Sequence, residues 1–376
     1  MRDVVVLGAG IHPYGLFPDK HYTAMAVEAC RSAFADAGVA WKEVGALYCG
    51  SVSLLPGCGH AVAFTLRPNG APVTNLENAS ASGSSAFREA FLAIALGEHD
   101  LVVALGVDKL KTNKGSRQMI DQGADPDKRF SPAHLFAKMA RDHMERYGTT
   151  IDQLAGVSVK SHCNASLNPN AHFRQPVTLE EVHTARVVAD PLTVLHCCPW
   201  DEGAAAVVLA AAEVAARFTA KPCPRVLASV AKGLPGPEAL LDITGALTDL
   251  TRSTAEEAYR RAAIAPRDLG IVELHDAFTI EEILYCESLG LCAPGEGGPF
   301  VGSGATEIGG KTPVNTDGGL LSMGHPLGPT GLGQIAEIFL QMRGEAGQRQ
   351  IPIPPQYGLA HMVAAGGVCV IHILGR

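Results

Sequence analysis

The sequence predicts an α/β protein built from two copies of one plan. Apolar runs without polar alternation recur along the chain, and strands covered on both faces have this composition because neither face meets water. Amphipathic stretches suited to helices lie between these runs. A helix–turn–strand segment also occurs twice. The expected strands are 4–10, 100–107, 204–212, 224–231, 270–274 and 368–374.

The repeated segment covers residues 26–50 and residues 255–275. In both, an Ala-rich helix leads through a turn with an acidic residue into an apolar strand. The matched residues are Glu28, Ala29 and Arg31 with Glu257, Ala258 and Arg260, then Glu43-Val44-Gly45 with Asp268-Leu269-Gly270. We therefore expect an N-terminal half at 1–218 and a C-terminal half at 219–376, joined near 216–224.

Residues 110–200 do not follow this alternation of strands and helices. The stretch is polar, contains His and Asn, and carries scattered prolines such as Pro132, Pro169, Pro176 and Pro191, so we expect an irregular insertion over the active site. Four amphipathic segments, one of them inside this stretch, predict helices. The expected helices are 84–97, 135–147, 280–290 and 331–345.

The amino-acid composition and net charge argue against several classes of function. The 376 residues are 47% hydrophobic and 18% charged, enough for two core-bearing domains, and the net charge of −8 argues against a nucleic-acid or anionic-membrane partner. Ten cysteines show no CxxC or Cys/His spacing, so we expect no metal site and a reducing compartment. No apolar run is long enough to span a membrane, and the N-terminus does not resemble a signal peptide. The expected location is the cytoplasm.

The stretch VTNLENASASGSSAFREA, residues 73–90, turns from a strand into a helix. Small residues at the turn let a ligand approach the backbone, and the helix N-terminus favours developing negative charge. Ser80 stands where a nucleophile is expected, although a hydroxyl needs a base to activate it. By contrast, GAG at 8–10 lacks the third glycine of a dinucleotide loop, and we interpret it as a tight turn after a strand.

Three histidines accompany loops at strand ends. His275 and Asp276 follow a strand and precede a helix, where open α/β sheets place ligand groups, and Asp276 suits a helix cap. His325 lies in a loop, 315–334, that contains six glycines and two prolines, a constraint that favours a functional geometry. His361 precedes a small-residue turn that suits backbone N–H donors for an oxyanion.

The motifs ENASASGSSA, HDAF, GGLLSMGHPLGPTG and AHMVAAGG resemble, in order and spacing, the four active-site loops of the thiolase superfamily. The nearest branch resembles the sterol-carrier-protein-type and archaeal acetyl-CoA acetyltransferase-like thiolases, over essentially the whole chain. The resemblance implies a thiolase-like fold of two duplicated α/β halves in a five-layered αβαβα arrangement. It also implies a homodimer, acyl-CoA as substrate with no bound cofactor, and a small zinc-ribbon and OB-fold subunit that helps to bind CoA.

The resemblance also implies roles for residues. Ser80 occupies the position of the nucleophilic cysteine, with His325 as its base and His275 holding the thioester oxygen. His361 stands where many thiolases carry a second, acid/base cysteine. The expected oxyanion donors are the backbone N–H groups of Ser80 and Val363, and the expected CoA contacts are Met323, Gly324 and Gly367.

Serine in place of cysteine leaves three explanations open. The serine has been introduced into a thiolase to disable it, or it is natural and acylated slowly, or covalent transfer has been abandoned for retro-aldol chemistry. The main hypothesis is a thiolase-type acyltransferase on 3-oxoacyl-CoA, impaired by Ser80. The alternatives are a CoA-ester aldolase of the same fold and a non-catalytic scaffold subunit.

Overall fold

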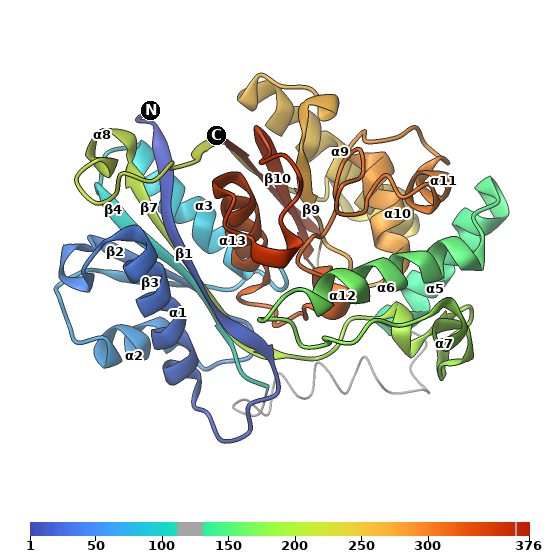
Figure 1. Ribbon diagram of the computed structural model, residues 1–376, viewed down its shortest axis with the longest axis horizontal. Coiled ribbons are helices and arrows are strands. Elements are labelled where there is room, and N and C mark those ends of the chain that lie inside the picture. Colours follow the sequence, from blue (N-terminus) through green and yellow to red (C-terminus); the bar gives the residue numbers. More distant parts are fainter. Residues whose placement is uncertain (111–130, 365–366) are drawn as a thin grey trace.

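The computed structural model describes residues 1–110, 131–364 and 367–376. Within these residues, nine strands form one mixed sheet in the order β3-β2-β4-β7-β1-β8-β11-β10-β9, and β5 and β6 form a separate pair. The halves of the large sheet meet between β1 and β8, through the single residue pair Val5–Arg225. The two halves of this one sheet therefore meet at a single short contact, and Figure 1 shows how the strands are arranged.

The first half contains β1 (Val4–Gly15), α1 (Tyr22–Ala37), β2 (Ala46–Gly50), α2 (Cys58–Thr65), β3 (Val73–Leu76), α3 (Ser82–Ala95), β4 (Leu101–Asp108), β7 (Glu202–Ala211) and α8 (Ala212–Ala215). The second half contains β8 (Arg225–Gly233), α9 (Ile243–Ala262), β9 (Ile271–Glu273), α10 (Thr279–Ser288), α11 (Gly297–Gly302), α12 (Gly319–Ser322), α13 (Thr330–Arg343), β10 (Tyr357–Ala364) and β11 (Val368–Gly375). Most of the expected strands and helices are confirmed, and α9 begins twelve residues before the repeat detected in the sequence.

The two halves have the same topology, which confirms the duplication. Strands β2 and β4 are parallel while β7 is antiparallel to β4 and β1; likewise β9 and β10 are parallel while β11 is antiparallel to β10 and β8. In the second half, an isolated bridge between Val272 and Val314 takes the place of the β2–β3 pairing of the first half. The helix between the first two strands is α1 in one half and α9 in the other.

Side chains on alternate strand positions enter different hydrophobic clusters. Val5 and Leu7 face α1, whereas Val4 and Val6 face the cluster that holds α3 and α13 together with side chains from both halves. The other face of the second half packs against α9, α10 and the insertion. Because side chains alternate along a strand, one face of the sheet packs against the outer helices and the other against the central ones. Helices α3 and α13 form the middle of five layers (Figure 1).

The insertion is more regular than we expected. Its described part contains α5 (Pro132–Tyr147), α6 (Ile151–Ser166), α7 (Leu179–Thr184), β5 (Val187–Ala189) and β6 (Leu192–Thr193); residues 111–130 lie outside the described residues. Local start signals explain the error. Ser131 caps α5 ahead of a proline at the first helical position, and Thr150 with Gln153 forms a capping box on α6.

The GAG segment is not a turn, as we had interpreted it, but the middle of β1. A β-carbon on Gly8 would lie 2.7 Å from the Ala33 carbonyl oxygen, and one on Gly10 would lie 2.3 Å from that of Ala29. Both glycines are required because the backbone of α1 packs directly on this strand.

Candidate functional site

Ser80 sits on a sharp turn between β3 and α3. Ala79 adopts a left-handed conformation with φ of +44°, which costs about 1 to 3 kcal/mol in a non-glycine residue. Two hydrogen bonds hold this turn: Ala79 N–H donates to Glu77 Oε1 at 2.7 Å, and the Ser82 hydroxyl donates to the Ala79 carbonyl at 2.7 Å. The strained turn directs the Ser80 side chain away from the helix and toward the second half.

His325 meets Ser80 directly. Its Nε2 lies 3.2 Å from Ser80 Oγ, and its Nδ1 lies 3.0 Å from Thr330 Oγ1. The Thr330 hydroxyl donates its one proton to the Pro326 carbonyl at 2.6 Å, so it can only accept from His325. His325 therefore carries its proton on Nδ1 and presents a bare Nε2 to the serine hydroxyl, the geometry of a general base.

Glycines let the two loops come this close. A β-carbon on Gly83 would lie 2.4 Å from the Gly328 carbonyl oxygen, and one on Gly328 would lie 2.8 Å from the Gly50 carbonyl oxygen. Gly328 N–H also donates to Asp108 Oδ2 at 2.5 Å. The small residues of both motifs thus place Ser80, on the first half, beside His325, on the second.

His275 lies edge-on to His325, with 5.3 Å between the ring centroids. Its Nδ1 lies 3.0 Å from Glu281 Oε1, on the first turns of α10. The Glu281 carboxylate also accepts from Phe278 N–H at 3.0 Å and from the Tyr285 hydroxyl at 3.2 Å. These three hydrogen bonds hold the Glu281 carboxylate in place, and its contact with Nδ1 orients the His275 ring.

His361, on β10, is fully buried. Its Nε2 lies 3.1 Å from Thr251 Oγ1 of α9, and its ring stands edge-on to Tyr285 at 4.7 Å. Tyr285 also bonds Glu281, so one side chain connects the surroundings of His361 and His275. His361 Nδ1 and His275 Nε2 are buried and have no hydrogen-bond partner among the described residues.

Burial keeps two of the imidazoles neutral. It lowers the pKa of His325 well below 6.5 and that of His361 to about 3, and charge repulsion from His275 lowers both pKa values further. A neutral imidazole can accept a proton. The structure thus brings Ser80, His275, His325 and His361 together from positions up to 281 residues apart, with two neutral bases and one carboxylate-paired histidine.

The remaining expected residues lie around this group. Val363 is on β10, where its neighbours Met362 and Ala364 pack with Ala81 of the serine turn, so the end of this strand contacts that turn. Gly367 lies beyond β10 with φ of +79°, and its carbonyl accepts from Leu234 N–H at 2.9 Å. The residues before it, 365–366, lie outside the described residues.

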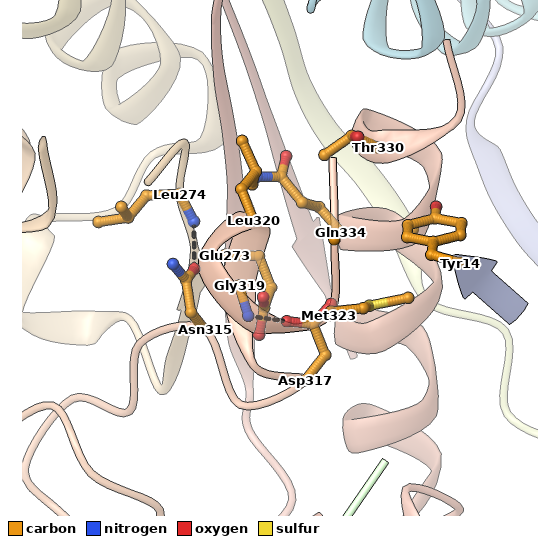
Figure 2. A pocket seen from close by; sticks show the side chains of 12 residues that line it. Tyr14, Glu273, Leu274, Asn315, Asp317, Gly319, Leu320, Met323, Thr330 and Gln334 are labelled. Atoms are coloured by element: carbon orange, nitrogen blue, oxygen red, sulfur yellow. Dashed lines mark hydrogen bonds between the residues drawn. The ribbon is translucent and has the colours of Figure 1, made fainter. Parts of the chain in front are cut away.

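Met323 and Gly324 line a small cavity. Figure 2 shows Met323 together with Thr330 and Gln334 at this cavity. Its volume is about 10 Å³, room for about one water molecule and too little for an acyl chain or CoA. Thr330 and Gln334 of α13 also line it; the first bonds His325 and the second donates to the His361 carbonyl at 3.2 Å. The cavity therefore belongs to the packing around His325 and His361.

Several contributing residues were missed from the sequence. Thr330 and Glu281 were not singled out. Thr330 lies within the glycine-rich motif, and Glu281 is the third residue of a capping box, a pattern that marks a helix start in the sequence. Asn315, with φ of +55°, was also missed; its Oδ1 accepts from Leu274 N–H at 2.8 Å. Asp276 is not the helix cap we expected, because its Oδ1 accepts from Leu320 N–H at 2.7 Å.

The described residues contain neither a metal-binding cluster nor a membrane-spanning helix. No group of three or more His, Cys, Asp or Glu side chains there is arranged to hold a metal ion. Across the same residues, no helix combines the length and apolarity needed to cross a membrane.

Comparison with known proteins agrees with this geometry. The family model "Thiolase, N-terminal domain" matches residues 4–213, and "Thiolase C-terminal domain-like" matches residues 239–376. An acetyl-CoA acetyltransferase of Methanothermobacter thermautotrophicus is 40% identical, with 100% of both chains covered. Sterol carrier protein 2 of Oryctolagus cuniculus is 34% identical, over 98% of this chain and 71% of that protein.

Among solved structures, one titled "Ltp2-ChsH2(DUF35) aldolase" is similar with a TM-score of 0.84 and 25% identity, and the match covers 100% of this chain and 98% of that one. The fold, the four active-site loops and these matches agree with one another over both halves of the chain. The protein belongs to the thiolase family.

Proposed function

We propose that this protein is a thiolase-type acyltransferase that acts on 3-oxoacyl-CoA thioesters, in CoA-dependent Claisen cleavage or its reverse. One observation carries the proposal: Ser80 Oγ lies 3.2 Å from the bare Nε2 of His325. This is the contact that a general base makes with the nucleophile it activates.

In the cleavage direction, His325 Nε2 takes the Ser80 proton as Oγ attacks the 3-oxo carbon. A bond forms between Oγ and that carbon, the bond to the α-carbon breaks, and the released acetyl-CoA enolate takes a proton from His361. CoA then attacks the acyl ester, its thiol proton passes to His361 and restores that residue, a C–S bond forms, and Oγ leaves with the proton that His325 returns. Condensation is the same sequence reversed.

The other groups stabilise charge. His275 Nε2 faces the developing enolate oxygen, and Glu281 orients the ring through its contact with Nδ1. The backbone N–H groups of Ser80 and Val363 serve the tetrahedral oxyanion. Met323, Gly324 and Gly367 remain proposed contacts for CoA, which enters as a substrate rather than a bound cofactor.

Serine slows this reaction. An alcohol is much harder to deprotonate than a thiol near pKa 8.5, even beside a histidine. An oxygen ester is also a weaker acyl donor to a thiol than a thioester is, so return of the acyl group to CoA is slower than its arrival. We expect the acyl group to accumulate on Ser80.

Intact-mass spectrometry tests this directly. The chain is incubated with acetyl-CoA and with acetoacetyl-CoA, and the expected result is the mass of one acyl group, located on the peptide that contains Ser80. Ser80→Ala is the control and acquires no adduct. Release of free CoA with no adduct on either substrate, or no reaction at all, contradicts acyl transfer through this residue.

A CoA-ester aldolase is the second candidate, favoured by two observations. The acyl-accepting thiol is replaced by a hydroxyl, and a similar solved structure is titled an aldolase. Such an enzyme splits a β-hydroxyacyl thioester by abstracting the hydroxyl proton, and the products are an aldehyde or ketone and a shorter acyl-CoA. Carbonyl release without free CoA and without an adduct on Ser80 identifies it.

The assembly and location are also proposals. A homodimer and a small CoA-binding subunit are supported by the exposed edge strand β3 and by the two-component title of the aldolase structure. Ten free cysteines without a pairing pattern suit the cytoplasm. A purely structural subunit remains an outcome of the assays: tight association with a partner and no turnover even after Ser80→Cys.

A further inference from the structure

A short segment of the insertion runs along the loop that carries His325. His172 N–H donates to the Met323 carbonyl at 2.9 Å, and Phe173 N–H donates to the Ser322 carbonyl at 3.0 Å. Asn168 Nδ2 adds a bond to the Asp317 carbonyl at 2.9 Å. The insertion therefore holds the backbone just before the catalytic histidine by three hydrogen bonds.

Asp201 completes this attachment. Its side chain is buried, and Oδ2 accepts from the backbone N–H of His325 at 3.0 Å. Oδ1 forms an ion pair with Nδ1 of His172, whose side chain is 23% exposed. Gly324 has φ of +122°, and a β-carbon there would lie 2.0 Å from Asp201 Oδ2, so the carboxylate occupies the space of a side chain at 324.

We propose that His172 and Asp201 are positioning residues for His325, with Asp201 fixing the backbone of the base and His172 supplying the charge that keeps Asp201 ionised. The proposal rests on the proposed role of His325 as base. Neither side chain takes part in the chemistry itself. The pair connects the insertion, which the sequence placed over the active site, to the position of one catalytic nitrogen.

The surrounding charges support an ionic pair. Burial raises the pKa of Asp201, while His172 and the His325 N–H lower it again; Asp201 in turn raises the pKa of His172. His172 is the cation among the groups that face Asp201, and the others are uncharged or acidic. The titratable groups near the carboxylate are His172, Tyr14, Cys198 and Glu202.

Replacing His172 has a predictable consequence. His172→Gln keeps a side-chain amide that can donate a hydrogen bond but removes the charge, so Asp201 becomes protonated at a higher pH and holds the loop less firmly. A base displaced by as little as about 1 Å can cost about 10²-fold in rate. We expect a 10- to 100-fold loss in kcat with little change in KM, and an acid limb of the pH profile that moves to higher pH.

The experiment uses the Ser80→Cys chain, with and without His172→Gln. One readout is acyl transfer from pH 5 to 9. A second is the rate at which iodoacetamide alkylates the introduced thiol, followed on its peptide by mass spectrometry. This rate reports how well His325 activates the thiol whether or not the chain transfers acyl groups, so failure of the proposed function and failure of this inference are distinguished.

His183→Gln is the matched control, because His183 also pairs with an aspartate, Asp152, at 2.9 Å within the insertion. It should leave both readouts unchanged. Asp201→Asn, which keeps an oxygen for the His325 N–H but loses the charge, should reproduce His172→Gln, and the double variant should be no worse than either. Unchanged kcat, acid limb and alkylation rate in His172→Gln would overturn the proposal.

Discussion

The hydroxyl of Thr330 determines which nitrogen of His325 faces Ser80. Thr330 Oγ1 lies 3.0 Å from His325 Nδ1 and donates its only proton to the Pro326 carbonyl at 2.6 Å. The imidazole must therefore donate from Nδ1, which leaves Nε2 without a proton, 3.2 Å from Ser80 Oγ. Thr330 thus sets the tautomer of His325.

Thr330→Val is expected to lower acyl transfer, since the methyl group cannot accept from Nδ1 and both tautomers become populated. Loss of the base itself, in His325→Ala, should cost about 10² to 10⁴ in rate, and Thr330→Val should lie between this variant and the parent. The measurement is kcat in the Ser80→Cys chain. Thr330→Ser keeps the hydroxyl and should behave as the parent; equal losses in Ser and Val variants would refute tautomer control.

Ser80→Cys is expected to raise thiolysis of acetoacetyl-CoA or of longer 3-oxoacyl-CoAs, because a thiolate forms far more readily than an alkoxide beside His325. Release of acyl-CoA is followed by absorbance. Ser82→Cys, on the same turn but bonded to the Ala79 carbonyl, is the control and should give no gain. No increase on any chain length in Ser80→Cys would favour the aldolase.

The acid limb of the Ser80→Cys reaction is expected well below pH 6.5. Burial and repulsion from His275 lower the pKa of His325, and the neutral imidazole is the active base. As the pH falls through 6.5, an ordinary histidine would gain a proton, whereas His325 stays neutral and activity persists. Profiles of kcat/KM between pH 4 and 8 check this; a limb at or above 6.5 would contradict it.

Glu281→Gln is expected to lower kcat by about 10²-fold, the scale of losing one oxyanion donor, because His275 loses the carboxylate that orients its ring. Tyr285→Phe removes a neutral hydrogen bond to the same oxygen and should cost much less. Steady-state kinetics in the Ser80→Cys chain and thermal unfolding are measured together. Equal kcat losses in both variants would indicate a packing role.

The isolated chain is expected to be a dimer of about twice 39.3 kDa. Strand β3 lies at the sheet edge, and α2, which packs on it, exposes 76% of Phe64. Pairing this edge with a second copy would satisfy its backbone groups and cover the ring. Phe64→Glu should weaken the dimer in light scattering, while Leu96→Glu, exposed at the end of α3, should not. A monomer at micromolar concentration contradicts the dimer.

Local signals in the sequence determined much of this protein. Continuous apolar runs predicted the buried strands, and the repeat at 26–50 and 255–275 predicted two halves, because strand and helix periodicities depend on neighbouring residues. Ser80, His275, His325 and His361 were selected for the same reason, since each lies in a small-residue or strand-end motif. The helix expected at 135–147 is α5 of the insertion, whereas the capping signal at Thr150 was overlooked and α6 and α7 were missed.

Only the tertiary structure decided how these residues work together. The tautomer of His325 depends on Thr330, the orientation of the His275 ring depends on Glu281, and the His325 backbone N–H donates to Asp201, which lies 124 residues away in the chain. Composition and spacing do not encode such contacts. They arise when α3 and α13 pack between two sheets, because close packing fixes which side chains meet and burial then sets their protonation.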